Sequence, residues 1–271
     1  LSLTSGYSSQ YEEVPRLETS QSYRTLGVHI AADGNMRKAL SLTRQTSENF
    51  AGLLSSSHLS RSEAYFAFVL YFYPKILYSL PVTTFTKKEC NYLQAPAMAA
   101  FLPKIGLNRH TARSIVNGPW RYGGLQLPDV YADQSFGQIR LFLGHLRRND
   151  QTSRLITIAI SVMQLRIGSR MLFLNLPYPK YEGWIEKTWL TSLWKFLHVS
   201  NLKVQVPPNI RFPREQRERD AFLMTEFIYQ GFKKQELELI NQCRLYHQVL
   251  SIADIAQADG VTIDPIYLGS H

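Results

Sequence analysis

Largely apolar positions recur at intervals of three and four along much of the chain, which is the spacing that lines one side of an α-helix. The clearest stripe consists of Met36, Leu40, Thr43, Ser47, Phe50 and Leu54. The opposite side carries Arg37 and Arg44. This pattern predicts a long amphipathic helix that begins close to residue 36.

The sequence S/T-x-x-E occurs at residues 60–63 and 86–89, each time just before an apolar or aromatic-rich stretch. It is typical of a capping box, in which the hydroxyl and the glutamate each accept a hydrogen bond from a backbone N–H of the first turn. We therefore expect a helix to begin at both places. Pro74 and Pro96 follow, and because proline lacks an N–H donor we expect them to kink or end these helices. The aromatic run at 65–73 covers every face of its helix, so we interpret it as bundle core and not as a stacking platform.

A second helical pair is predicted beyond a glycine-rich loop at residues 118–124. Its first stripe contains Phe136, Ile139, Leu143 and Leu146, and its second contains Leu155, Ile158, Ala159 and Val162. We expect both stripes to face the core. The Pro-Tyr-Pro sequence at 177–179 resembles a linker. Beyond it we predict a helix at 189–197, a short strand at 202–206 and a helix at 220–229.

Near the start of the chain, residues 23–30 (Y-R-T-L-G-V-H-I) alternate apolar and polar positions, which indicates a β-strand. The A-D-G-N sequence at 32–35 predicts the turn that ends it. Residues 1–22 are polar and serine-rich, with a turn at Gly6, and are typical of the loose end of a sheet.

Together these elements predict a mainly α fold, in which a helical bundle is preceded by a short β segment and followed by a second helical unit with minor β structure. The segments that we distinguish are 1–34, 35–106, 107–176 and 177–271. With 271 residues, of which 45% are hydrophobic, the chain is long enough to bury one large core or two modest ones.

The chain is basic, since 30 Lys and Arg residues outnumber 21 Asp and Glu residues and give a formal net charge of +9. Such an excess favours a polyanionic partner, foremost nucleic acid and then a membrane surface. The longest uncharged apolar stretch, 64–74, is well short of the roughly 20 residues that span a bilayer. The chain begins at Leu1 without a charged leader, which indicates a fragment or a processed product. Cys90 and Cys243 are isolated, as expected for free thiols of an intracellular protein.

We expect no catalytic residue and no metal site in this chain. Metal-dependent nucleotidyl transfer requires converging carboxylates, and the nearest similarity, Y-A-D-Q at 131–134, replaces the second acid with an amide. The seven histidines lack zinc-site spacing, and neither a phosphate-binding loop nor a serine-hydrolase motif occurs. Scattered acids near the C-terminus are interpreted as solvated helix faces and turn acids. They are Glu226, Glu236, Glu238, Asp254, Asp259 and Asp264.

Arginines near aromatic residues are the remaining functional signal, because phosphates pair with guanidinium groups and bases stack on rings. The predicted nucleic-acid-binding residues are Arg37, Arg44, Arg109, Arg113, Trp120, Arg121, Arg140, Arg147 and Arg148. Tyr122 lies beside two of them in the sequence. The alternative is that exposed arginines only keep a helical protein soluble.

Several stretches carry a resemblance to a known family. They are the Leu-Gly pair of 23–30 followed by A-A-D-G-N, L-N-R-H at 107–110, P-W-R-Y-G-G-L-Q-L-P at 119–128, T-W-L-T-S-L-W-K-F-L at 188–197, R-E-R-D-A-F-L-M at 217–224 and C-R-L-Y-H-Q-V-L-S-I-A-D-I at 243–255. In this order they resemble the primer grip, thumb and following region of reverse transcriptases from non-LTR (LINE-like) retrotransposons, with residues 35–102 similar to the thumb.

The resemblance implies an RNA-directed DNA polymerase whose partners are an RNA template and a DNA primer strand. It implies that Leu26 and Gly27 back the primer near its 3′ end, with Arg24 or His29 near a phosphate. The fingers, and the palm with its F/Y-x-D-D box and Mg²⁺, are implied to precede Leu1, so this chain would hold no cofactor itself. For the parent element, the nucleus and cytoplasm are implied.

Two other functions fit the composition. One is a non-catalytic module that binds RNA or protein, such as the remnant of a decayed retroelement. The other is peripheral membrane binding through basic amphipathic helices, which the wide apolar faces disfavour because such faces are typical of a protein core.

Overall fold

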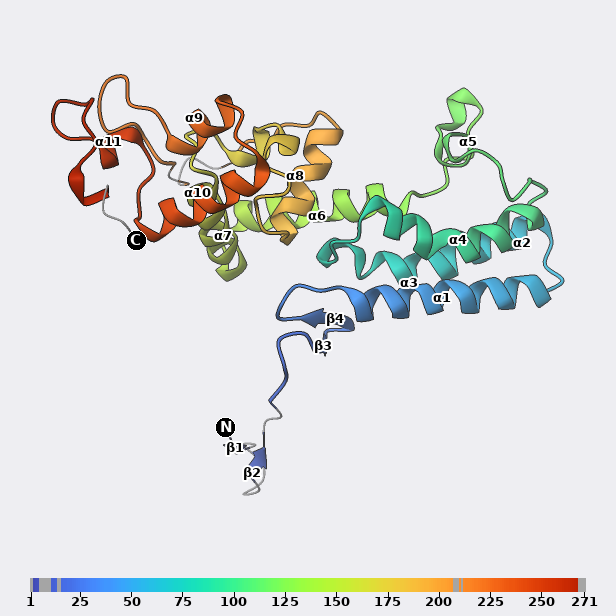
Figure 1. Cartoon of the computed structure of the whole chain (residues 1–271). Helices are drawn as coiled ribbons and strands as arrows, with labels where there is room; N and C mark the ends of the chain where they lie inside the picture. The colour runs from blue at the N-terminus through green and yellow to red at the C-terminus, as the bar shows by residue number, and fades with distance from the viewer. Residues whose placement is uncertain (1, 5–10, 14–15, 207–209, 211, 268–271) are drawn as a thin grey trace. The chain divides into compact units, whose positions relative to one another are not determined.

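The structure is a computed structural model that describes residues 2–4, 11–13, 16–206, 210 and 212–267, with side chains from residue 16 onward. It is mainly helical with a short β segment on the N-terminal side, which confirms the predicted fold class (Figure 1). The chain divides into two compact units. We call Leu1–Asp133 unit 1 and Gln134–His271 unit 2, and their boundary lies within helix α6 (Val130–Arg148).

Unit 1 contains two antiparallel strand pairs and a helical bundle. Its other elements are β1 (Ser2–Thr4), β2 (Tyr11–Glu13), β3 (Ser22–Thr25), β4 (Val28–Ala31), α1 (Arg37–Ser56), α2 (Arg61–Phe66), the π-helix η1 (Ala67–Phe72), α3 (Tyr73–Leu77), η2 (Leu80–Val82), α4 (Lys87–Lys104), α5 (Arg113–Asn117) and η3 (Trp120–Tyr122). The turn predicted at Gly6 lies outside the described residues. The turn predicted at 32–35 is present, with Gly34 at a positive φ of 76°.

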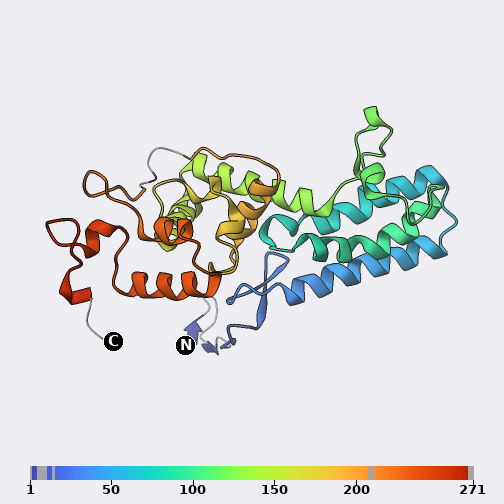
Figure 2. The same cartoon turned by 45° about the horizontal axis from the view of Figure 1, so that its top comes forward.

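The bundle of unit 1 is built around α1, which packs along α4 as both views show (Figure 1, Figure 2). Both predicted capping boxes are present, at Ser60 for α2 and at Thr86 for α4. Aromatic rings fill the core, and Phe68 stacks on Phe101 with 4.4 Å between ring centroids. The predicted core role of the aromatic run is therefore confirmed for its buried members, Phe68, Phe72 and Tyr73, whereas Tyr65, Phe66 and Tyr71 are exposed.

Neither proline ends its helix. Helical structure continues without a break from α2 through η1 into α3, and the wide π-helical turns immediately precede Pro74. In α4, Pro96 lacks the N–H that would pair with the carbonyl of Tyr92, four residues earlier. A guanidinium N–H of Arg44 on α1 donates to that carbonyl instead. The neighbouring helix thus satisfies the acceptor that the proline leaves open.

Residues 23–30 form a β-hairpin and not the single strand that the alternation predicted. β3 pairs with β4 in the register Thr25 to Val28, and Leu26 and Gly27 are the two turn residues. Their φ angles are 48° and 86°, as a type I′ turn requires at both central positions. The alternation was misleading because the turn reverses the chain in the middle of the pattern, leaving Leu26 at the tip with 86% of its surface exposed.

Unit 2 is organised around Trp194. Besides most of α6, its elements are α7 (Gln151–Ile167), η4 (Phe173–Asn175), η5 (Tyr178–Lys180), α8 (Trp189–Val199), α9 (Leu223–Tyr229), α10 (Lys234–Tyr246), α11 (Ile252–Ile255) and η6 (Pro265–Tyr267). The Trp194 ring lies 5.3 Å from that of Phe173 and 5.2 Å from that of Tyr178. The linker interpretation of 177–179 is therefore wrong, because Tyr178 is buried against the centre of this core.

Helix α7 buries the face opposite to the one that its apolar stripe predicted. Ile160, Met163 and Ile167 are buried, whereas Leu155 and Ile158 are about 60% exposed. The buried face also contains two polar residues. Gln164 is buried because its amide bonds the backbone of the chain that follows the helix, at Ser169, Met171 and Phe173. Ser153 is buried at the N-terminal end of the same face.

The expectation for α6 was partly right. Leu146 is buried, and Ile139 and Leu143 pack against the core of unit 2. Phe136 is half exposed and contacts Phe196 at 5.5 Å between ring centroids.

The segment 202–206 does not form the predicted strand. The side-chain amide of Asn175 accepts from the N–H of Val204 and donates to its carbonyl, both at 3.0 Å. One asparagine thus makes the two hydrogen bonds that a neighbouring strand would provide.

Candidate nucleic-acid interface

The tip of the β3–β4 hairpin is fastened to the helical bundle by a tyrosine. The Tyr78 hydroxyl, directly after α3, donates to the carbonyl of Leu26 at 2.9 Å. A Cβ on Gly27 would lie 3.5 Å from the Tyr78 ring, so the ring is in contact with the turn. The Leu26 side chain therefore projects from a fixed backbone. Arg24 and His29 face each other across the two strands, which brings all four predicted primer-grip residues onto this hairpin.

The first half of α1 forms a basic groove with α4. Its lining includes Arg37, Leu40, Ser41, Arg44, Gln45, Glu48 and Tyr92. Arg44 is held by the fold, since it pairs with Glu48 at 2.7 Å and its guanidinium lies 4.2 Å above the Tyr92 ring, in addition to its bond to the Tyr92 carbonyl. Arg37 is exposed in the first helical turn, which contains no acidic residue.

A third predicted region is the loop between α4 and α6, which projects from the bundle in both views (Figure 1, Figure 2). Two glycines close it. A Cβ on Gly124 would lie 2.1 Å from the carbonyl oxygen of Gly118, and the N–H of Gln126 donates to that same oxygen at 2.9 Å. Val116 and Leu127, on the two sides of the closure, are buried in the core of unit 1. The loop is therefore an anchored element with a defined backbone.

The tip of this loop presents the predicted residues Trp120 and Arg121 together with Tyr122. The two aromatic side chains are 72% and 74% exposed, and the Arg121 guanidinium lies 4.6 Å above the Tyr122 ring. Arg109 and Arg113, the other two predicted cations of the loop, are exposed as well.

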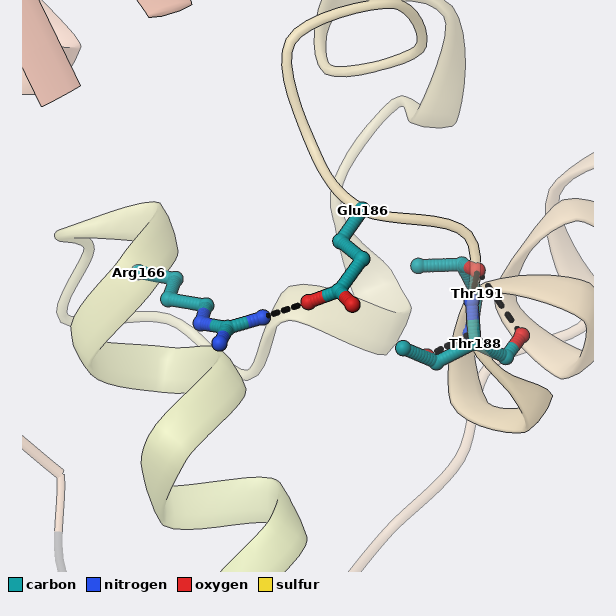
Figure 3. A network of polar contacts seen from close by, with 4 residues as sticks. All are labelled: Arg166, Glu186, Thr188 and Thr191. Atoms are coloured by element: carbon teal, nitrogen blue, oxygen red, sulfur yellow. Dashed lines mark hydrogen bonds and ion pairs between the residues drawn. The ribbon is translucent and has the colours of Figure 1, made fainter. Parts of the chain in front are cut away.

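The remaining predicted arginines belong to unit 2. Arg140, Arg147 and Arg148 are all exposed on α6, and their spacing of seven and eight residues places them along one side of that helix. By contrast, Arg166 at the end of α7 pairs with Glu186, just before the capping box formed by Thr188 and Thr191 at the start of α8 (Figure 3). Its charge is used within the fold.

The acidic residues serve structural roles. The Tyr73 hydroxyl donates to the carboxylate of Asp133. The pKa of Tyr73 lies above its usual value, mainly because the hydroxyl is buried and secondly because of this carboxylate. Glu236 accepts the N–H of Lys233, the residue just before α10, and Asp254 accepts those of Leu250 and Ser251. Across the described residues, no group of three or more His, Cys, Asp or Glu side chains is placed to hold a metal ion.

Three residues at these surfaces were not among the predicted site residues: Tyr78, Tyr92 and Tyr122. Tyr122 adjoins Trp120 and Arg121, so its neighbours in the sequence pointed to it. No comparable signal marks Tyr78, which is 52 residues from its partner Leu26.

Within the described part of the chain, no helix is long and apolar enough to cross a membrane. Comparison with protein-family models, with curated proteins and with solved structures finds no match.

Proposed function

We propose that unit 1 grips the hybrid duplex of an RNA template and a DNA primer, as the primer-grip and thumb region of a non-LTR retrotransposon reverse transcriptase. One observation carries the proposal, namely the exposed Leu26 at the tip of a hairpin that is fastened to a basic helical bundle. A left-handed backbone at a residue other than glycine costs about 1–2 kcal/mol. The exposed side chain of Leu26 regains little of that energy by packing. Fold stability therefore does not explain this residue, which supports a role for it in contact with a ligand.

The groups around the hairpin suit a nucleic-acid backbone. An apolar tip can rest on the edges of the sugars, a contact that does not depend on the base sequence. Cations pair with the phosphates and set the register of the duplex. The start of α1 adds the positive end of a helix dipole to the charge of Arg37, and no acid in its first turn opposes them. Arg24 on β3 lies on the same hairpin as Leu26. Arg44 has a structural role, so we assign the phosphate contact of α1 to Arg37.

Polymerisation itself would be the work of a palm elsewhere in the parent polypeptide, whose carboxylates would hold Mg²⁺. Unit 1 would supply grip and position. The arginine row of α6, formed by Arg140, Arg147 and Arg148, would offer a further sequence-independent surface for phosphates.

The test is binding of the whole chain to a labelled, blunt RNA–DNA hybrid across a series of salt concentrations. We expect affinity to fall steeply with salt, and Arg37→Ala to lower the slope of log affinity against log salt by about 1. Leu26→Ala should weaken binding at every salt concentration. The matched control is Leu239→Ala, which removes an exposed leucine of α10 in unit 2. Salt-independent binding, no binding at low salt, or equal affinities for the two leucine variants would refute the proposed grip.

A further inference from the structure

The loop that carries Trp120 has the features of a preformed binding surface. Its glycine closure and its buried anchors fix the backbone, so little conformational entropy would be lost when a ligand binds. The indole Nε1 of Trp120 donates to the carbonyl of Leu125 at 3.1 Å. This bond fixes the orientation of the ring and satisfies its polar edge. What Trp120 offers to a partner is therefore a flat aromatic face.

The charged residues of the segment that carries this face have one sign. Residues 90–128 contain no Asp or Glu, whereas Arg109, Arg113 and Arg121 all belong to the loop. A ligand suited to this surface must combine flat rings with regularly spaced negative charge. Nucleobases on a phosphate backbone have this chemistry.

Only an unpaired strand can use the surface fully. In a duplex the bases are already stacked on one another and their faces are covered, whereas an unpaired base is free to stack on an aromatic side chain. The Arg121 guanidinium covers the Tyr122 ring at 4.6 Å, and this pair is a second flat, cationic surface next to Trp120.

We propose that the loop centred on Trp120 binds unpaired nucleotides by base stacking, with Arg109, Arg113 and Arg121 holding the strand through its phosphates. This names a second substrate class for unit 1, single-stranded RNA or DNA, beside the duplex that the hairpin grips. Assigning the bound strand to the unpaired part of a template rests on the proposed function, but the stacking itself does not.

The experiment measures binding of the intact chain to a fluorescein-labelled oligo(dT) and an oligo(U) of about 12 nucleotides, a length within the range that such sites cover. Trp120→Ala is expected to weaken binding about 5- to 150-fold, the effect of losing one stacked base. Trp120→Phe keeps an aromatic face and should retain most of the affinity. The matched control is Tyr229→Ala, which removes an exposed aromatic residue of unit 2 and should leave binding unchanged.

A second readout covers the case in which Trp120→Ala disturbs the loop. Unlabelled oligonucleotide should quench the tryptophan emission of the wild-type chain, and Trp120→Phe should remove that quenching while the tryptophans of unit 2 remain. The inference is overturned if Trp120→Ala binds like Tyr229→Ala, or if quenching persists in Trp120→Phe. Leu26-dependent binding of the hybrid, together with oligonucleotide binding that does not depend on Trp120, would overturn this inference but leave the grip standing. Trp120-dependent binding of the oligonucleotides without any binding of the hybrid would do the reverse.

Discussion

Arg244 provides the sharpest test of how unit 2 is held together. This arginine on α10 is only 4% exposed, and no carboxylate in the described part of the chain pairs with it. Its guanidinium instead donates to the carbonyls of Leu165 and Arg166 at 2.7 and 2.9 Å, and to that of Val249 at 3.2 Å. Since α7 ends at Ile167, the carbonyls of its last turn have no helical donor. Arg244 therefore caps α7 from another helix.

The expected magnitude follows from these bonds. Burial lowers the pKa of Arg244 to about 10, so the group remains a cation at neutral pH. In Arg244→Met the side chain is similar in length, but three carbonyls lose a charged donor, at about 1–3 kcal/mol for each one left unsatisfied. Removing the guanidinium also removes its own desolvation cost, several kcal/mol. The loss at three carbonyls outweighs this regained cost, so we expect a net loss of about 3 kcal/mol or more.

Urea unfolding followed by tryptophan fluorescence measures this loss. Trp184, Trp189 and Trp194 all lie in unit 2, so the signal reports mainly on that unit. With a slope of about 2 kcal/mol per molar urea, the midpoint should fall by at least about 1.5 M. The control is Arg214→Met, at an exposed position. A free energy of unfolding for Arg244→Met within about 0.5 kcal/mol of that of this control would refute the capping role.

Two further predictions concern local structure. Asp150 caps α7, and its pKa is held low by its hydrogen bond with His145 and then by that from the N–H of Ser153. Because the folded pKa lies below the unfolded value of about 4, the stabilisation by the carboxylate is present above that pH and is lost as pH falls through the folded pKa. The difference in urea stability between wild type and Asp150→Asn should therefore shrink as pH falls below about 4, and a difference independent of pH would contradict this. Gly124→Ala should open the loop that carries Trp120 and destabilise it by about 1–3 kcal/mol, measured as faster cleavage there by chymotrypsin. Its control, Gly144→Ala in α6, has open space around the new Cβ and should leave the cleavage rate unchanged.

The sequence by itself determined the local structure of much of this protein. The capping boxes at Ser60 and Thr86 start helices because their hydrogen bonds join residues three apart. The stripe through Phe50 and Leu54 faces the core of unit 1, and Ser47, the polar residue within the stripe, is buried with it. The glycine-rich loop and its arginines were also visible, since they are close together along the chain.

Tertiary structure decided everything that depends on a distant partner. The buried face of α7 carries Ile160, Met163 and Ile167, and also Gln164, whose amide bonds the backbone beyond the end of the helix. The stripe that begins at Leu155 therefore indicated the wrong side. Arg44 was predicted to bind phosphate, and that stays a prediction; what only the tertiary structure shows is that Pro96 leaves a carbonyl open on another helix and that an Arg44 N–H donates to it. Leu26 was predicted to lie within a strand, but it lies in a turn, and its carbonyl accepts a hydrogen bond from Tyr78, 52 residues away. Hydrophobic periodicity reports only the spacing of apolar residues along the chain. Which face of a helix is buried also depends on the hydrogen bonds that distant parts of the chain can make.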